Sequence, residues 1–352
     1  MKKIVKQVAG IDVAQDELVV CLGRMHDDWT SELYSSKTFA NSTKGFTSFV
    51  EWVKKLTDAS VAVRFVMEAT GVYHESLAYY LDEHKLEVSI VLPSKISSYA
   101  RSLDVKTVTD KTASEAITLF GLERKLDRWS RPNGLYKKLR QLTRERGQLI
   151  DERTVFKNQL HAEQAEAEPY KKSIERIKKR IAFLDKQEKE IMQELAEMIK
   201  TDEEMQRLIL LICSLPGVSL LTAAIVLGET YGFDLIRNKR QLTSYAGLDV
   251  KEKKSGTSVK GKSRISKRGN KHLRKAMHMP ALAAIRHDER YKAVFARLVS
   301  RHGIKMKAAV AVQRKLLEMM YTIFKTNKPY DKNYFKNQIE ETELITTEAI
   351  KN

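Results

Sequence analysis

The sequence predicts an α/β domain, a helical arm with coiled-coil character and a mainly α-helical domain, and its 352 residues suit two or three domains. Short apolar runs alternate with helical patterns over residues 1–130, which predicts the α/β domain. Heptad patterns predict the arm over residues 131–201. Residues 202–330 are expected to be helical around one basic, glycine-containing interruption, and residues 331–352 to form a flexible tail.

Five strands and three helices are expected in the first domain. The spacing of Phe46, Phe49, Val50 and Val53 places these four side chains on one side of the first helix. Three antiparallel strands followed by two β-α units are the order of the ribonuclease H type of fold, which is RuvC-like. The strands are expected over residues 5–14, 18–23, 36–40, 61–69 and 88–92, and the helices over residues 42–56, 73–83 and 112–126.

Two heptad runs predict a helical hairpin over the arm. Arg146 and Arg153 interrupt the first run, and Glu188 interrupts the second. The hairpin is either a dimerisation or spacer arm or a pair of helices packed on their own domain, and the long runs with charged flanks favour the arm. The apolar positions are Leu135, Leu139, Leu142, Leu149, Phe156 and Leu160, then Ile174, Ile177, Ile181, Leu184, Ile191, Leu195 and Met198.

The charge balance indicates a polyanionic partner. Lys and Arg number 63 against 45 Asp and Glu, a formal net charge of +18, while 42% hydrophobic residues are enough for folded cores. Nucleic acid is the expected partner, because clustered cations gain affinity by releasing counterions from phosphates.

Several classes of protein are disfavoured. Cys21 and Cys213 form no CxxC pair, which argues against a zinc site or a disulfide framework and suits a reducing compartment. The sequence has no run of about 18 apolar residues that would predict a transmembrane helix, and acids interrupt the place where a signal peptide needs its apolar stretch. We therefore expect a soluble, cytoplasmic protein without a membrane partner.

Three acids predict a metal site. Asp12 lies inside an apolar strand and Glu68 ends another, where an acid is costly to bury without a partner, and Asp110 begins a predicted helix. On a ribonuclease H topology these elements converge. Carboxylate oxygens gathered there would hold Mg²⁺, and two such ions can activate an attacking oxygen and stabilise a leaving one.

Each acid also has a structural explanation. Asp110 could cap its helix, Asp12 could start a β-turn, and Glu68 could pair with Arg64. The presence of two acids in apolar strands favours the metal site.

Residues 237–275 are expected to bind nucleic acid, because fourteen Lys or Arg oppose only Asp249 and Glu252 there. The turn at Leu215–Val218 either offers backbone N–H groups to a phosphate at Gly217 or is an ordinary connection between helices. The nucleic-acid-binding candidates in the basic segment are Lys253, Lys254, Lys260, Lys262, Arg264, Lys267, Arg268, Lys271 and Arg274.

Ser255 lies beside Gly256 within this basic segment. Its hydroxyl could attack a phosphodiester, with nearby cations stabilising the transition state. A Ser-Gly pair in a loop is more often only a turn.

Taken in order, these motifs resemble the DEDD transposase family of insertion sequences, which includes Piv-type invertases and bridge-RNA-guided serine recombinases. The resemblance covers about 320 residues, both halves of the chain. It is carried by Gly10–Val13, Met67–Gly71, Thr109–Lys111, Leu215–Val218, Tyr245–Leu248, Ser255–Gly256, Ile265–Asn270 and Leu273–Arg274.

The resemblance implies a RuvC-like domain, a coiled-coil arm and a transposase domain. It implies that Asp12, Glu68 and Asp110 bind Mg²⁺ and that Ser255 forms a covalent phosphoserine link with DNA. It also implies a composite site in which different protomers supply acids and serine, and a structured bridge RNA that selects donor and target DNA. The apolar heptads of the arm predict a dimer, with a tetramer expected on DNA.

Ala113 departs from the family pattern, which has Asp three residues after the Asp of the Thr-Asp-Lys motif. Either the site is naturally degraded or the chain was altered to block catalysis, and the intact surroundings favour the second. Both predict weak or absent strand cleavage.

Three functions from different classes are therefore considered. The leading one is an RNA-guided, Mg²⁺-dependent serine recombinase of a mobile element. The alternative is a RuvC-like nuclease or junction resolvase that uses activated water, with Ser255 as a turn residue. The third is a non-catalytic nucleic-acid-binding scaffold.

Overall fold

The computed structural model describes residues 2–69, 71–103, 107, 109–234, 236–252 and 264–333, and the backbone alone of residues 254–255 and 259–260. The chain divides into two compact units, Met1–Arg131 and Pro132–Asn352.

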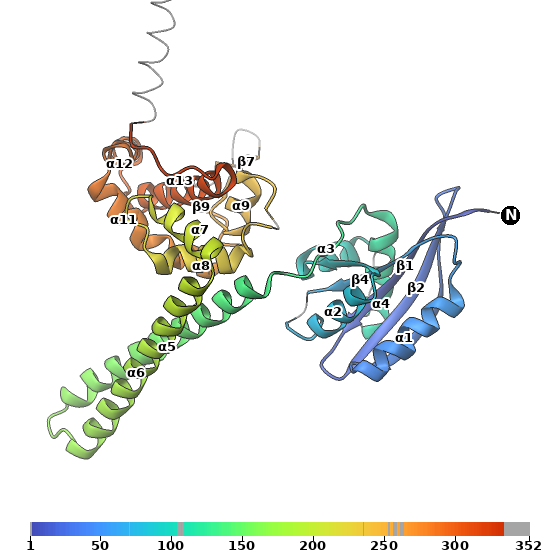
Figure 1. Cartoon of the computed structure of the whole chain (residues 1–352), viewed down its shortest axis with the longest axis horizontal. Helices are drawn as coiled ribbons and strands as arrows, with labels where there is room; N and C mark the ends of the chain where they lie inside the picture. The colour runs from blue at the N-terminus through green and yellow to red at the C-terminus, as the bar shows by residue number, and fades with distance from the viewer. Residues whose placement is uncertain are drawn as a thin grey trace, which may run out of the picture. The chain divides into compact units, whose positions relative to one another are not determined.

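The first unit contains one five-stranded mixed sheet in the order β3-β2-β1-β4-β5 (Figure 1). β1 pairs antiparallel with β2 and parallel with β4, β2 pairs antiparallel with β3, and β4 pairs parallel with β5. This arrangement confirms the predicted RuvC-like fold. The elements are β1 (Ile4–Val13), β2 (Glu17–His26), β3 (Ser31–Ala40), α1 (Thr43–Leu56), β4 (Val63–Glu68), α2 (Glu75–Glu83), β5 (Glu87–Val91), α3 (Pro93–Ser102) and α4 (Asp110–Glu123).

Helices cover both faces of this sheet, and the strands divide their side chains between them. Ala9 and Ile11 of β1 share a buried cluster with α1 and α2, whereas Val8 shares a second cluster with α3 and α4. Successive strand residues point to opposite faces, so this division assigns the even-numbered residues of β1 to the α4 face. In β4, Phe65 packs in the first cluster and Val66 in the second, which assigns its even-numbered residues to the same face.

The helix α3 was not predicted, and β2 and β3 are longer than expected. α3 is short and polar, with Pro93 at its first turn and only Ile96 and Tyr99 buried. A ten-residue pattern with two apolar anchors is too weak to indicate a helix without its packing partner.

In the part of the second unit that the structure describes, the regular elements are helices and four two-residue strands. Its helices are α5 (Gly134–Gln164), α6 (Lys171–Thr201), α7 (Glu203–Cys213), α8 (Leu220–Thr230), α9 (Lys239–Tyr245), α10 (Lys271–Ala276), α11 (His278–His287), α12 (Glu289–His302) and α13 (Lys305–Thr326). Its strands are β6 (Val250–Lys251), β7 (Lys254–Ser255), β8 (Val259–Lys260) and β9 (Arg264–Ile265), and they occupy the predicted basic interruption.

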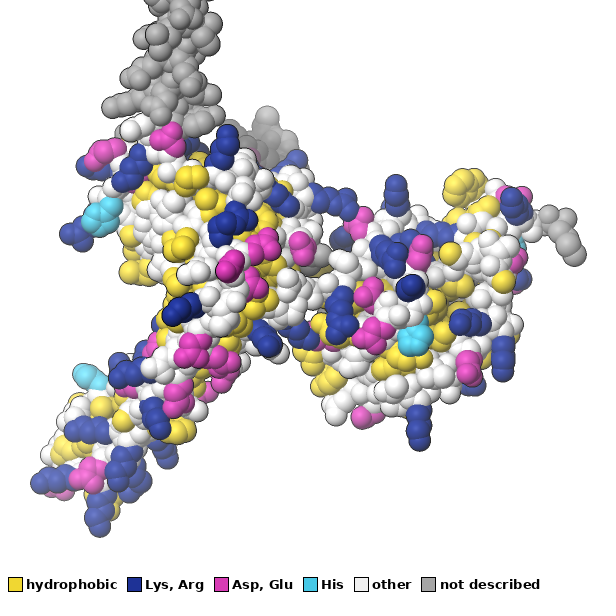
Figure 2. All heavy atoms as spheres, viewed as in Figure 1, with side chains coloured by type: hydrophobic (Ala, Val, Ile, Leu, Met, Phe, Trp, Pro, Cys, Tyr) yellow, Lys and Arg dark blue, Asp and Glu magenta, His cyan; other side chains and the backbone are white. Residues whose placement is uncertain are grey.

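In the hairpin of α5 and α6, the apolar stripes of the two helices pack against each other. The residues that interrupt the heptads pair across the same seam: Arg146 lies 2.7 Å from Glu188, and Arg153 contacts both Glu188 and Asp185. On the face of the hairpin that Figure 2 shows, many charged side chains lie at the surface among hydrophobic ones. The two stripes therefore pack within one chain, and dimerisation through this hairpin stays a prediction.

The base of the hairpin belongs to the core of the second unit. Leu139 of α5 and Ile191 and Leu195 of α6 are buried in the same cluster as the residues of α7, α8 and α13. The predicted boundary between arm and C-terminal domain, at residues 201–202, lies inside this unit.

Within the part of the chain that the structure describes, no helix combines the length and the apolar character needed to cross a membrane. Cys21 and Cys213 are both free thiols, as the sequence predicts.

Candidate active site and nucleic-acid interface

Asp12, Glu68 and Asp110 come from three elements that meet at one edge of the sheet. Asp12 lies near the end of β1 and Glu68 ends the adjacent parallel strand β4. Both are even-numbered, so both belong to the face that α4 covers. Asp110 is the first residue of α4, which packs against β1.

A glycine brings α4 close to the strand that carries Asp12. A Cβ at Gly10 would lie 2.2 Å from Thr118 Oγ1 and 2.8 Å from the carbonyl oxygen of Ser114, so no larger residue fits there. Thr118 also donates to the carbonyl of Cys21 at 3.0 Å, which ties α4 to β2. This close packing sets the position of the first turn of α4 relative to Asp12.

The charges of Asp110 and Glu68 act on the carboxyl of Asp12. The pKa of the Asp12 carboxyl is raised from 3.8 to about 6. Burial is the largest cause, and the nearby negative charges of Asp110 and Glu68 add to it. Only a hydrogen bond from the backbone of Val13 acts in the opposite direction. The carboxyl of Asp12 therefore lies where burial and two nearby negative charges disfavour its ionised form.

The structural explanations for the three acids do not match the geometry. Thr109, not Asp110, caps α4, since its hydroxyl accepts from the backbone N–H of Thr112 at 3.2 Å. Arg64 pairs with Glu87 at 2.6 Å and donates to the carbonyl of Leu126 at 3.0 Å, rather than pairing with Glu68. Asp12 is paired with Val19 inside the β1–β2 ladder rather than in the turn.

The donor chemistry at this edge fits a hard divalent cation. Carboxylate oxygens are preferred by Mg²⁺, and a cation would relieve the crowding of charge that raises the Asp12 pKa. Among the residues that the structure describes, however, no group of three or more His, Cys, Asp or Glu side chains is gathered as a ligand set.

Ala113 lies in the first turn of α4, three residues beyond Asp110. Its N–H donates to the carbonyl of Thr109 at 2.8 Å, and its side chain is half-buried. Residues three apart on a helix are neighbours on one face, so an acid at this position would share the face of Asp110.

Ser255 lies on a small two-tier stem. β7 and β8 pair antiparallel, with Ser255 opposite Val259 and Lys254 opposite Lys260. The segments that flank them pair as β6 and β9, with Val250 opposite Ile265. Lys253 and Lys262 lie outside the described residues, as do the side chains of Ser255, Lys254 and Lys260.

The remaining basic candidates follow this stem. Arg264, Lys267, Arg268 and Lys271 are exposed, which suits contact with a polyanion. Arg274 is half-buried and donates from Nη1 to the carbonyl of Ala246 at 2.8 Å, so it also has a structural role.

Gly217 lies in the turn between α7 and α8, packed on α11. It adopts φ of +78°, and a Cβ there would approach Ala283 Cβ to 2.7 Å and the carbonyl oxygen of Pro280 to 2.8 Å. This packing is a structural reason for glycine, and the phosphate contact stays a prediction.

Glu229 is not among the residues that the sequence patterns single out. It is fully buried in α8, and its carboxylate accepts a hydrogen bond from the Asn270 amide at 2.6 Å. The available signal was the one that marked Asp12: an acid inside an apolar segment.

Comparison with protein families places both halves of the chain among transposases. Residues 210–296 match the family described as "Transposase IS116/IS110/IS902 family", and residues 9–164 match the DEDD transposase model of IS110 type, described as "Transposase". The chain belongs to this family of transposases. The resemblance predicted from the motifs is confirmed, and so is the assignment of the protein as a transposase of the DNA recombination class.

Curated relatives agree with this assignment. The transposase is 29% identical over 340 residues to the pilin gene-inverting protein of Moraxella lacunata, covering 93% of this chain and 98% of the relative. It is 28% identical over 337 residues to the corresponding protein of Moraxella bovis, with the same coverage. An insertion element IS110 protein of Streptomyces coelicolor is 28% identical over 118 residues, which cover 34% of this chain and 29% of that protein.

Among solved structures, the transposase is similar to Thermus thermophilus RuvC in complex with a Holliday junction substrate. The TM-score is 0.27 at 12% identity, and the match covers 35% of this chain and 99% of RuvC. The fold assignment rests on the order and direction of the five strands and not on this score.

Proposed function

We propose that this transposase is a site-specific DNA recombinase of a mobile element that uses Ser255 as nucleophile, Mg²⁺ at Asp12, Glu68 and Asp110, and a structured bridge RNA as guide. The observation that carries the proposal is that β1, β4 and α4 bring the three acids to one edge of the sheet, where burial and then the charges of Asp110 and Glu68 raise the pKa of Asp12. Perturbed carboxylates of this kind are typical of functional sites.

The covalent step conserves the number of phosphodiester bonds. The Ser255 hydroxyl loses its proton as Oγ bonds to phosphorus, and the phosphorus–oxygen bond to one deoxyribose breaks. The released deoxyribose oxygen takes up a proton. A strand hydroxyl then attacks the phosphoserine, which forms the new phosphodiester and returns the proton to Ser255.

Mg²⁺ bound by the acids would neutralise charge on the phosphate and stabilise the leaving oxygen. The exposed cations Arg264, Lys267, Arg268 and Lys271 follow the Ser255 stem and would hold nucleic-acid phosphates. The family resemblance supports a site built from two protomers, and the heptads of the arm are the basis for proposing a dimer that becomes a tetramer on DNA.

Ala113 removes the fourth acid of the family pattern, so we propose that this chain is impaired in strand cleavage. With one carboxylate fewer, Asp12, Glu68 and Asp110 would hold Mg²⁺ weakly. Binding of DNA and RNA by the second unit does not depend on this acid and is expected to persist.

The test is an assay for a covalent protein–DNA adduct in the Ala113→Asp variant. The full chain is supplied with Mg²⁺, a plasmid carrying the junctions of its own element, and RNA transcribed from the flanking DNA. We expect an adduct that survives denaturation, at a level at least about 100-fold above the parent chain, because acid and metal contributions of this kind act on the chemical step.

Control variants separate the alternatives. The double variant Ala113→Asp/Ser255→Ala should lose the adduct, whereas cleaved DNA without adduct in that variant would favour the nuclease that uses water. Adding Asp12→Ala or Glu68→Ala to Ala113→Asp should abolish activity, and unchanged activity would favour the non-catalytic scaffold. Omitting the RNA should abolish the choice of site.

A further inference from the structure

Glu229 is a buried acid in an unfavourable position. It lies in the last turn of α8, a helix whose neighbouring side chains are apolar, and only 1% of its surface is exposed. The end of a helix carries partial negative charge, which disfavours a second negative charge there. Such a residue persists only where strong partners surround it.

Arg144 of α5 supplies the first partner, with both nitrogens of one guanidinium edge on the carboxylate. Its Nε lies 2.7 Å from Oε1 and its Nη2 lies 2.9 Å from Oε2. Gly228 makes this approach possible, since a Cβ there would lie 2.8 Å from the backbone nitrogen of Arg140. Burial by itself raises the Glu229 pKa, but the hydrogen bonds from Arg144 and Asn270 lower it below its usual value.

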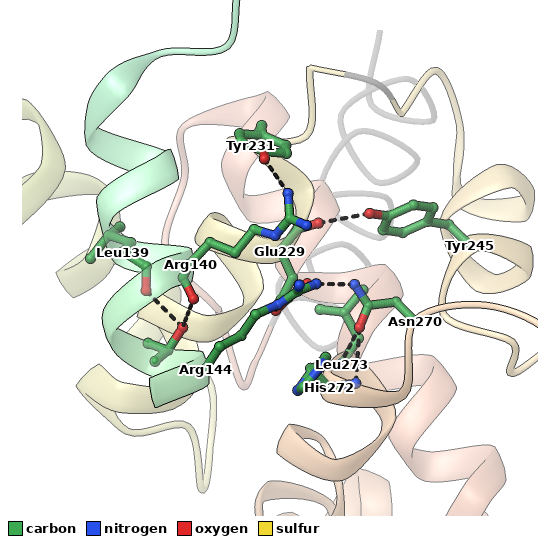
Figure 3. Close-up of polar contacts among 10 residues, drawn as sticks. Leu139, Arg140, Arg144, Glu229, Tyr231, Tyr245, Asn270, His272 and Leu273 are labelled. Atoms are coloured by element: carbon green, nitrogen blue, oxygen red, sulfur yellow. Dashed lines mark hydrogen bonds and ion pairs between the residues drawn. The ribbon is translucent and has the colours of Figure 1, made fainter. Parts of the chain in front are cut away.

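Asn270 supplies the second partner and connects three elements (Figure 3). Its Nδ2 donates to Glu229 Oε2 at 2.6 Å, and its Oδ1 caps α10 by accepting from His272 and Leu273 N–H. Its own N–H donates to the carbonyl of Tyr245 at 2.8 Å, and the Tyr245 hydroxyl donates to the Glu229 carbonyl at 3.0 Å. The amide thus donates to the acid while it caps the helix.

This arrangement holds the backbone from which three cations project. Gly269, immediately before Asn270, has φ of +136°, and a Cβ there would lie 2.3 Å from the carbonyl oxygen of Tyr245. The N–H of Lys267 donates to the carbonyl of Gly247 at 3.1 Å. Lys267, Arg268 and Lys271 flank this fixed segment, and all three are exposed.

We infer that Glu229 is a positioning residue for the nucleic-acid interface. Through its hydrogen bond with Asn270, Glu229 fixes the backbone that carries Lys267, Arg268 and Lys271, and so orients their side chains. Through its ion pair with Arg144, it links this segment to α5 of the hairpin. The inference rests on the proposed function, because it assigns these cations to nucleic-acid phosphates.

The chemistry of Asn270 offers a substitution that separates this role from capping. Asp caps a helix as well as Asn does, but its second oxygen would face the Glu229 carboxylate and repel it. In the double variant Asn270→Asp/Glu229→Gln the polarity is reversed: the Gln amide donates to the new carboxylate while its oxygen accepts from Arg144. The double variant has the same net charge as the parent chain.

The experiment measures the affinity of the full chain for a short duplex DNA of arbitrary sequence, without divalent metal, over a range of salt concentrations. Each phosphate contact contributes about 0.9 to the slope of log affinity against log salt. We expect Asn270→Asp to flatten this slope by about two and to weaken binding at least about tenfold, and the double variant to recover both. Because the double variant would also repair a loss of fold, denaturant unfolding of each variant must show that it is folded under the conditions of the binding assay.

Two controls keep the result decisive. Glu197→Gln removes one exposed acid from α6 and should leave the slope unchanged. If Asn270→Asp does not fold, Asn270→Ser takes its place, because serine caps a helix but is too short to reach Glu229.

The outcomes distinguish this inference from the proposed function. If the parent chain shows no salt-dependent DNA binding, the proposed interface is wrong and this inference with it. If the parent binds but Asn270→Asp keeps the slope, only the positioning role is overturned. A double variant that stays weak would show that the added charge at residue 270, and not its partnership with Glu229, causes the loss.

Discussion

The two units each place an acid inside an apolar element, and the two acids behave in opposite ways. Asp12 in β1 is surrounded by the further acids Glu68 and Asp110, and its pKa is raised to about 6. Glu229 in α8 is surrounded by Arg144 and Asn270, and its pKa is lowered. Burial raises the pKa of both carboxyls, so burial alone does not distinguish the two acids. The neighbours do, because the charges of Asp110 and Glu68 add to the effect of burial at Asp12, whereas Arg144 and Asn270 reverse it at Glu229.

The largest effect is expected at the compensated acid. Glu229→Ala should lower the free energy of unfolding by about 3 kcal/mol at pH 7, because it removes the carboxylate that compensates Arg144 and Asn270. Since the folded pKa of Glu229 is lowered, its ionisation stabilises the protein above the usual value of 4.5, and this contribution is lost as pH falls below it. Denaturant unfolding at pH 7 and pH 4 measures both. A variant as stable as the parent at pH 7 would remove the contrast between the two acids.

The site at Asp12 should respond to a divalent cation. Mg²⁺ at ten times its dissociation constant stabilises a folded protein by about 1.4 kcal/mol. We expect a rise in melting temperature with Mg²⁺ that is larger in Ala113→Asp than in the parent chain and absent in Asp12→Asn. Thermal unfolding with Mg²⁺ and with Na⁺ at equal ionic strength measures the difference. An equal shift in all three proteins would mean that the ion binds elsewhere.

The smallest effect is expected from Asp12 itself, with a sign opposite to that of Glu229. Because its folded pKa is raised from 3.8 to about 6, ionisation costs stability as pH rises between these values. Asp12→Asn should therefore stabilise the metal-free protein at pH 8 by about 1 kcal/mol, allowing for solvent screening at a half-buried carboxyl, and have no effect near pH 4. Denaturant unfolding at the two pH values decides this. Asp16→Asn, in the exposed β1–β2 turn, should change neither value.

Much of the first unit could be predicted from local patterns. Short apolar runs along β1 and β4 located the strands, whereas the face that Asp12 and Glu68 share follows only from the packing of the two strands. In α1 the predicted apolar side, Phe46, Phe49, Val50 and Val53, is the side that is buried. The heptads likewise predicted α5 and α6, since periodicity reports which face a helix buries.

The same periodicity did not predict what each face packs against. The interruptions Arg146, Arg153 and Glu188 look like defects in separate heptads, but in the structure they pair across the hairpin. The sequence predicted only a basic loop at Ser255 and not the paired strands that carry it. Each of these strands has two residues, which is too short to show an alternating pattern.

By itself the sequence determined the RuvC-like order of elements, the helical hairpin and the transposase family, because these depend on local spacing and on ordered motifs; the metal site at Asp12, Glu68 and Asp110 stays a prediction. Only the tertiary structure decided that Thr109 caps α4 in place of Asp110, that Arg64 pairs with Glu87, and that Glu229 joins α5 to Asn270. Each of these is a choice among several partners of similar chemistry. Residues far apart in the chain make that choice only when packing brings them within hydrogen-bonding distance.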